Sequence, residues 1–464
     1  MLRGWLRMQG ETGESGPDLG PRAVDLDEVK ALARARYPGG VAVDFDQSWA
    51  AREGATQRLI VDPAVPAIFG GCFTFQGVEA RVGILARTTG GWLVIEQKSV
   101  NRIHEKHELD VAASAWAVKG AGLPVVGLRL LHLDREYSRG SSGVDPRQLF
   151  IEVEVEPVDF SETAEILGLE LASMPVVETG EQCTRPRRCE FHGRCNPVPG
   201  PFSIHHLPKS GRVHLDLVAR GVDDIRKVPS DVRLKPMQQH AVWAMVNGRE
   251  YVSHALGPAL TNVQFPLRFL DIECVAPPVP RWPGARPFEQ FPTQWSIHTL
   301  QADGSLAHEA FLHRADSDPC SAFARSIIAS AGSDGNVIVY SEGEIQVLRR
   351  LAETVPECWG DIDGILDRTR ELLRVLREHY YHPSLDGSFS LKSVLPAVCP
   401  ELGYEGLSIA EGASAGKAWL DLVDDRKPAA EREQVANALL AYCERDTLGM
   451  VRLRERLLAK AAAT

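Results

Sequence analysis

The sequence predicts an α/β protein made of more than one domain. Its 464 residues are too many for one ordinary hydrophobic core. Segments with strand-like and helix-like spacing of apolar residues follow one another along the chain. Hydrophobic residues make up 44% and charged residues 24%, the balance of a globular protein. No apolar run approaches the roughly 18 residues that a membrane span needs, so we expect no membrane partner.

The first module begins with a helix and continues with a hairpin. Apolar residues at helical spacing predict a helix over 24–37. Two strand-like runs flank a Thr-Thr-Gly-Gly turn and predict a hairpin over 79–97. A helix over 108–119 and strands over 124–133 and 148–156 are expected to follow.

Strand-like segments open the last part of the chain, and helical ones close it. A Pro- and Gly-rich break over 197–201 ends the first module, and residues 205–255 are mostly polar and helical. Strands are expected over 266–272, 293–300 and 336–340, and helices over 344–354, 361–379 and 429–460. We therefore predict three domains, over 1–200, 201–262 and 263–464.

Acidic residues in three separated places form the strongest signal of function. Asp271 and Glu273 are two apart on a strand, so their side chains point to the same face. Glu344 stands at the start of a helix that follows a strand. Tyr442 and Asp446 are four apart on a helix and share one face of it. Hard ions such as Mg²⁺ or Mn²⁺ prefer such oxygen ligands, and two of them promote phosphodiester hydrolysis.

Each motif alone is weak, because solvated acidic pairs are common, but their order resembles that of the DEDD 3′→5′ exonucleases. An ending of Tyr-x3-Asp resembles the tyrosine subclass of these enzymes. The resemblance implies that Asp271, Glu273, Glu344 and Asp446 hold the metal and that Tyr442 positions the attacking water. The family usually has Asp in the second motif, so the longer Glu344 is a departure that can change the metal spacing.

A wider resemblance covers nearly the whole chain. The stretches FLDIECVAPPVPRWPGARPFEQFPTQWSIH, HYYHPSLDGSFSLKSVLPAVCPELGY and LLAYCERDTLGMV look like a bacterial family of unknown function. Its members join a RecB-like nuclease region to a DnaQ-like exonuclease region. This implies a restriction-endonuclease fold before a ribonuclease-H-like fold, and DNA or RNA as the partner. Family knowledge gives no established substrate.

Basic residues near the acidic motifs are candidates for phosphate contact. Arg370, Arg374 and Arg377 recur at helical spacing within the helix expected over 361–379, and Lys392 follows. A solvated helix face is an equally good interpretation of the three arginines. The net charge of −11 does not favour nucleic acid, but phosphate contact needs only a local basic surface.

Three cysteines form a second candidate metal site. Cys183, Cys189 and Cys195 are regularly spaced, as in a zinc knuckle or an iron–sulfur site such as a 4Fe-4S cluster. Three buried free thiols are the alternative. Iron–sulfur nucleases of the RecB-like kind add a cysteine near the N-terminus, and MLRGWLRMQG has none. Arg187 and Arg188 in the same loop are candidates for phosphate binding. The odd total of nine cysteines predicts a reducing cytosol.

The hairpin carries a third, weaker motif. Glu96 and Lys98 form the Glu-x-Lys of PD-(D/E)xK nucleases, in which the Glu ligates Mg²⁺. The acidic ligand that this family has on the preceding strand falls at Gly83. We interpret this site as degraded and the first module as a holder of nucleic acid.

The leading hypothesis is thus a cytosolic two-metal 3′→5′ exonuclease acting at the C-terminal carboxylates. Two alternatives stay open. One is a scaffold that binds nucleic acid without chemistry. The other is an endonuclease that uses Glu96 and Lys98.

Overall fold

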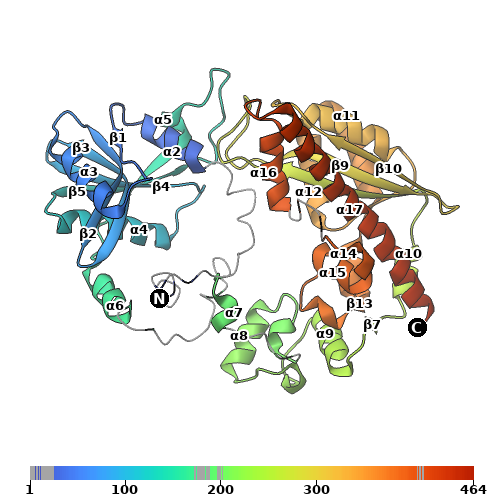
Figure 1. The fold of residues 1–464 in the computed structure, drawn as a ribbon. Coiled ribbons are helices and arrows are strands. Elements are labelled where there is room, and N and C mark those ends of the chain that lie inside the picture. The colour runs from blue at the N-terminus through green and yellow to red at the C-terminus, as the bar shows by residue number, and fades with distance from the viewer. Residues whose placement is uncertain are drawn as a thin grey trace. The chain divides into compact units, whose positions relative to one another are not determined.

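The chain is mixed α/β, as predicted, and forms two compact units in a computed structural model (Figure 1). The structure describes residues 26–171, 189–195, 202–404 and 412–464, and single residues 6, 9, 11, 174, 183, 200, 406 and 409. Unit 1 comprises Met1–Cys195 and Ala276–Glu289, and unit 2 comprises Asn196–Val275 and Gln290–Thr464. Residues 201–262, predicted as a separate module, fall in the same unit as the C-terminal part.

Unit 1 is built on a six-stranded sheet in which the strands follow their order in the chain. The strands are β1 (Val41–Ala42), β2 (Ala67–Phe75), β3 (Val78–Thr88), β4 (Gly91–Lys98), β5 (Val125–Leu133) and β6 (Phe150–Val155). The neighbouring strands β1 and β2 are parallel, as are β4 and β5, and the other neighbours are antiparallel. The hairpin predicted over 79–97 is therefore confirmed as β3 and β4.

Helices cover both faces of this sheet. They are α2 (Leu26–Ala35), α3 (Trp49–Val61), α4 (Glu105–Gly120), α5 (Pro146–Leu149) and α6 (Ser161–Leu171), and unit 1 also contains the short helix α7 (His192–Cys195). Neighbouring residues Ile84 and Leu85 of β3 lie in different buried clusters, because successive strand residues point to opposite faces. Val111 of α4 packs in the cluster of Leu85, and Val29 of α2 packs in that of Ile84.

The larger sheet of unit 2 has five strands in the order β10-β9-β8-β11-β12. Their bounds are β8 (Leu267–Val275), β9 (Phe291–Leu300), β10 (Leu306–Leu312), β11 (Asn336–Val339) and β12 (Thr369–Glu371). Only β9 runs antiparallel to the rest, because β10 and β8 both pair with it in antiparallel fashion while β11 and β12 continue in parallel.

Several helices surround this sheet, and the longest crosses it. They are α11 (Cys320–Ala331), α12 (Glu342–Thr354), α13 (Trp359–Asp367), α14 (Leu372–His379), α15 (Leu391–Val398), α16 (Gly412–Leu422) and α17 (Ala429–Ala462). Helix α17 packs on β8, β9 and β10. The single helix predicted over 361–379 is wrong. Residues Thr369–Glu371 instead pair with Val337–Val339 as an edge strand, which ends α13 and precedes α14.

The stretch before β8 is largely helical and packs within unit 2. It contains α8 (Gly211–Ala219), α9 (Pro236–Asn247) and α10 (Leu256–Thr261), with β7 (Tyr251–Val252) paired to β13 (Tyr380–Tyr381). Short 3-10 turns lie at Ile204–His206, Ile225–Lys227, Pro356–Cys358, Pro383–Leu385 and Pro400–Leu402. Among the described residues, no helix combines the length and the apolar character that crossing a membrane requires.

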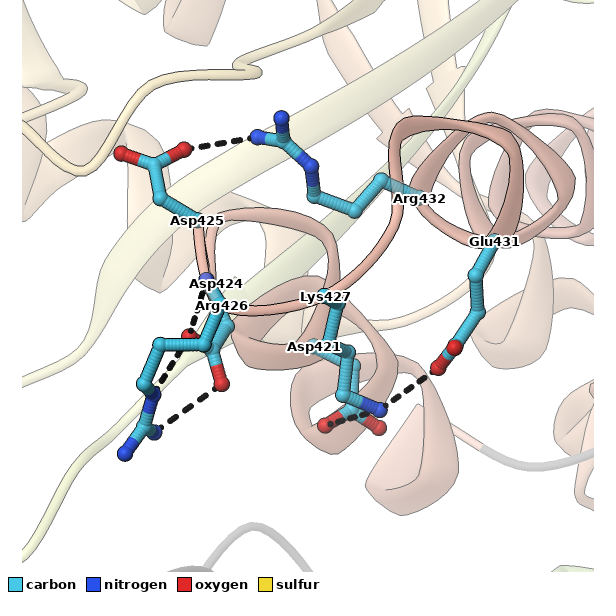
Figure 2. Close-up of polar contacts among 7 residues, drawn as sticks. All are labelled: Asp421, Asp424, Asp425, Arg426, Lys427, Glu431 and Arg432. Carbon is cyan, nitrogen blue, oxygen red and sulfur yellow. Dashed lines mark hydrogen bonds and ion pairs between the residues drawn. The ribbon is translucent and has the colours of Figure 1, made fainter.

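Ion pairs hold the turn between α16 and α17 (Figure 2). Arg432 contacts Asp425 at 2.7 Å, Arg426 contacts Asp424 at 2.8 Å, and Lys427 contacts Asp421 at 3.2 Å and Glu431 at 2.9 Å. Exposed pairs of this kind each contribute little free energy. Together they mark where α17 begins, and α17 carries the third acidic motif.

Candidate functional site

Three of the predicted acidic residues meet where α17 crosses β8. Ligand oxygens of Asp271, Glu273 and Asp446 all lie within 4.8 Å of one another. The strand presents the first two on one face, and the helix supplies the third from 173 residues after Glu273. Asp446 is buried, whereas Asp271 and Glu273 are half-buried. Because Asp271 and Glu273 are partly exposed, an ion can reach this carboxylate group from their side.

Burial and mutual repulsion favour the protonated forms of these acids. Burial, followed by the charges of Asp446 and Glu273, raises the pKa of Asp271 well above its usual range. Burial and then the Asp446 charge raise the pKa of Glu273 to about 8. Burial also raises the pKa of Asp446 to about 6. Crowded carboxylates of this kind gain most from a nearby cation, because it removes the repulsion that protonation otherwise relieves.

Glu344 lies near the three acids but has another contact. It occupies the third position of α12, where its Oε2 accepts hydrogen bonds from the Ser341 backbone N–H at 3.3 Å and the Ser341 hydroxyl at 3.1 Å. This capping box satisfies the helix end. Within the described residues, Glu344 is not in the group that lies within 4.8 Å. Its charge nevertheless raises the pKa of Asp271 and Glu273, so it belongs to the same electrostatic neighbourhood.

Tyr442 and Lys392 face the same acids. The Tyr442 hydroxyl, which can donate its one proton to either acid, lowers the pKa of both Glu273 and Asp446 against the larger effect of burial. The Lys392 ammonium lies 5.3 Å from the centre of the Tyr442 ring, and its charge also lowers the pKa of these two acids. Lys392, predicted only as a contact for substrate phosphate, thus stands beside the carboxylate group.

Three site residues were not predicted. The Tyr404 hydroxyl donates to Oδ1 of Asp446, and the Lys392 ammonium lies 5.7 Å from the Tyr404 ring centre. The Cys443 thiol donates to Oδ2 of Asp271 at 3.0 Å, and burial keeps its pKa well above the usual range. At Gly412, where α16 begins, an added Cβ would lie 3.4 Å from Oε2 of Glu273. Cys443 stands inside the Tyr-x3-Asp motif, but a thiol is not a ligand that hard ions select.

The three arginines do not lie on one helix. Arg370 lies in β12, and only Arg374 and Arg377 are in α14. The predicted helical stripe is therefore wrong, because the edge strand interrupts the helix. Arg370 donates to the carbonyl oxygen of Asp367 at 3.1 Å, and Arg374 pairs with Glu378 at 3.0 Å. A role of these arginines in phosphate contact stays a prediction.

The acidic motif of unit 1 consists of one buried carboxylate held by the protein itself. Oε1 of Glu96 accepts from the Gly83 backbone N–H at 3.1 Å and from the Ser114 hydroxyl at 2.9 Å. Burial raises the pKa of Glu96. Lys98 pairs with Asp110 of α4 at 2.7 Å. Gly83 thus lies directly beside Glu96, where the sequence comparison placed the missing acidic ligand, and a Cβ there would stand 3.3 Å from Glu96 Oε2.

The three clustered cysteines influence one another. The Cys189 backbone N–H donates to the Cys183 carbonyl oxygen at 2.8 Å. Burial, and then the charges of Cys183 and Cys189, raise the pKa of Cys195. Arg187 and Arg188 lie outside the described residues. A zinc ion or iron–sulfur cluster at these cysteines stays a prediction.

Comparison with known proteins finds one family. Residues 268–390 match the family described as a domain of unknown function, DUF2779. This match includes Asp271, Glu273 and Glu344 and ends before Tyr442 and Asp446. No curated protein and no solved structure matches the chain.

Proposed function

We propose that this protein is a metal-dependent 3′→5′ exonuclease that acts on DNA or RNA at the carboxylates of unit 2. One observation carries the proposal. Asp271, Glu273 and Asp446, which lie far apart in the sequence, place their ligand oxygens within 4.8 Å of one another. Because these donors are all carboxylate oxygens, they fit a hard divalent ion such as Mg²⁺ or Mn²⁺.

The topology supports this proposal. A sheet ordered β10-β9-β8-β11-β12 with only β9 antiparallel supports the ribonuclease-H-like fold that the proposal needs. Its first strand in the chain, β8, carries Asp271 and Glu273. In unit 1, the run of β2, β3, β4, α4 and β5 supports a RecB-like fold, since three antiparallel strands are followed by a helix and a parallel strand.

Each side chain has a role in this proposal. Bound divalent ions activate the attacking water and stabilise the leaving oxygen. Asp271, Glu273 and Asp446 would hold them, and Glu344 would join once its carboxylate leaves the Ser341 cap. The Tyr442 hydroxyl, which acts on both Glu273 and Asp446, would orient the water.

Lys392 would neutralise charge on the substrate. Its charge acts on both Glu273 and Asp446, and its side chain is partly exposed to solvent. A scissile phosphate that approaches the carboxylate group meets this ammonium, and such contacts position a nucleic acid without reading its sequence.

Unit 1 would hold nucleic acid or serve the architecture, and the three clustered cysteines would bind a zinc ion or an iron–sulfur cluster.

A non-catalytic nucleic-acid scaffold is the second candidate function. The observation that favours it is the capping contact of Glu344. The carboxylate of this residue, the acid of the second motif, accepts hydrogen bonds from Ser341 and is therefore not directed at a metal. The endonuclease alternative has less support, because Asp110 neutralises Lys98 and Gly83 supplies no ligand beside Glu96.

The test is nuclease activity on labelled strands. The full chain is incubated with single- and double-stranded DNA and RNA, labelled at either end, with Mg²⁺, Mn²⁺ or a chelator. We expect early release of a 3′ label as mononucleotide, progressive shortening of 5′-labelled strands, and no cleavage of closed circles. Binding without any degradation would instead establish the scaffold, and cleaved circles would establish the endonuclease.

A further inference from the structure

We propose that His298, His308 and Glu444 form a second metal site, selective for Zn²⁺ or a similar transition metal, beside the carboxylate group. One nitrogen of each histidine and one carboxylate oxygen all lie within 4.8 Å of one another. Two imidazoles and a carboxylate are the ligand set of many zinc sites that keep one open position. This inference does not depend on the proposed nuclease activity.

The strands and the helix bring these ligands together in a simple way. His298 of β9 and His308 of β10 are direct cross-strand partners, and their rings stack with centres 4.4 Å apart. Glu444 reaches them from α17, with Oε1 3.8 Å from Nδ1 of His308. Two atoms that share a zinc ion at about 2.1 Å each can be no more than about 4.2 Å apart. The His308–Glu444 pair is thus close enough to share a zinc ion, and small side-chain rotations would bring in His298 as the third ligand.

A chain of hydrogen bonds links the two histidines to α17. The Thr447 hydroxyl can donate its one proton to the α17 backbone, with the Glu444 carbonyl oxygen at 3.1 Å. In that arrangement its other two contacts, His298 Nδ1 and the Ser296 hydroxyl, both at 2.8 Å, donate to it. Nδ1 of His298 then carries the proton, and Nε2 keeps its lone pair.

The same reasoning extends to His308. Because the Ser296 hydroxyl has used its proton toward Thr447, it can only accept from His308 Nε2, which lies 2.9 Å away. This leaves Nδ1 of His308, 3.8 Å from Oε1 of Glu444, as the nitrogen that would bind a metal. Each imidazole thus has one nitrogen in a hydrogen bond and the other available as a ligand. Such outer contacts fix tautomer and ring orientation in known metal sites.

The chemistry of this site differs from that of the carboxylate group. Nitrogen donors suit Zn²⁺ and similar ions, whereas the all-oxygen group suits Mg²⁺ or Mn²⁺. His298 is buried, but 27% of the His308 side chain and 51% of the Glu444 side chain are exposed, which leaves an entry path. A bound ion would fasten α17 to β9 and β10 two residues before Asp446, and so would hold the third carboxylate in place.

The experiment measures Zn²⁺ bound per chain after dialysis of the full-length protein. Asp271→Asn is present throughout, so that the carboxylate group takes up less metal, and the cysteines contribute equally to every variant. We expect His308→Ala and Glu444→Gln each to lose one ion per chain. Thr447→Val should bind that ion about 10–100-fold more weakly, because it removes an outer contact and not a ligand. Glu309→Gln is the matched control, since Glu309 neighbours His308 but points to the other face of β10.

Thermal unfolding gives an independent readout. Zn²⁺ should raise the melting temperature of the control more than that of His308→Ala, since any zinc at the cysteines acts equally on both. Equal zinc content and equal zinc-induced stabilisation in His308→Ala and the control would show that the cluster is a hydrogen-bond network alone. Nuclease activity is assayed separately on the parent chain with Asp271 intact. Loss of one zinc ion in His308→Ala, together with an inactive parent chain, would uphold this site and overturn the proposed function.

Discussion

The two units each enclose carboxylates at a mixed sheet, but among the residues that the structure describes only unit 2 brings several together. In unit 1, Glu96 has a raised pKa because of burial, and protein donors from Gly83 and Ser114 satisfy it. In unit 2, Asp271 and Glu273 have raised pKa values because of burial and because they face each other and Asp446. Burial alone therefore does not define a metal site. What distinguishes unit 2 is that its carboxylates have several acidic neighbours in addition to hydrogen-bond donors.

The largest expected effect follows from removing one acid of the carboxylate group. Asp271→Asn and Asp446→Asn should each lower metal-dependent degradation of 3′-labelled strands at least about a hundredfold, since a bound ion supplies several kcal/mol of transition-state stabilisation. The fold should persist, because the neutral amides reduce repulsion. Asp425→Asn is the matched control, since Asp425 is 90% exposed and pairs with Arg432 before α17 begins (Figure 2). Undiminished degradation by Asp271→Asn would refute the assignment.

A smaller effect is expected at Tyr442. Tyr442→Phe keeps the ring beside Lys392 but removes the hydroxyl that bonds Glu273 and Asp446. We expect kcat to fall by about a hundredfold, within the usual range for a positioned proton-transfer group, with KM nearly unchanged. Single-turnover kinetics with separate measurement of substrate affinity check this split. A change in affinity alone would assign Tyr442 to substrate binding.

The carboxylate group should also make the metal-free protein less stable at higher pH. Glu273, with a pKa of about 8, and Asp446, with a pKa of about 6, hold protons that unfolded Glu and Asp release near pH 4. The folded state binds more protons in this window, so the free energy of unfolding falls as pH rises from about 4 to 8. The melting temperature measured in chelator should fall by a few degrees over this pH range. Glu273→Gln should make this fall smaller, and Mn²⁺ should oppose it. Equal dependence of the melting temperature on pH in parent and variant would contradict the assignment.

The smallest effect is expected in unit 1. Glu96→Ala and Lys98→Ala should leave 3′-end degradation nearly unchanged, because Gly83 provides no second ligand and Lys98 pairs with Asp110. At most, loss of the Lys98 charge should weaken nucleic-acid binding slightly. The comparison is made against Asp271→Ala on the same substrates. Equal losses in Glu96→Ala and Asp271→Ala would show that unit 1 is catalytic after all.

The sequence predicted the elements that carry the acids better than those that surround them. Strand β8 and helix α17 were placed correctly, because β8 contains the short apolar run Phe269-Leu270 and α17 is a long helical segment. Strand β10 was missed because its residues Leu306–Leu312 are mostly exposed and lack alternation. Strand β12 was missed because three residues between two helices look like helix.

The same contrast holds within the candidate site. Spacing alone placed Asp271 and Glu273 on one face of a strand, because residues two apart on a strand share a face. Tyr404, by contrast, reaches Asp446 from a loop 42 residues earlier. Gly412 approaches Glu273 from the start of α16. No local spacing rule relates such positions, since only the tertiary fold brings them together.

The path of the chain through the two units limits how the protein can be divided. Strand β8 ends at Val275, and residues Ala276–Glu289 belong to unit 1 before β9 begins unit 2 again. In unit 1, Val279 is buried and Arg139 donates to the Pro280 carbonyl oxygen at 2.8 Å. A truncated protein that starts at residue 263 would carry this segment stripped of its partners, with an apolar side chain exposed to water. Neither unit is therefore a single uninterrupted stretch of polypeptide, and we expect soluble expression of unit 2 alone to need this segment replaced with a short polar loop.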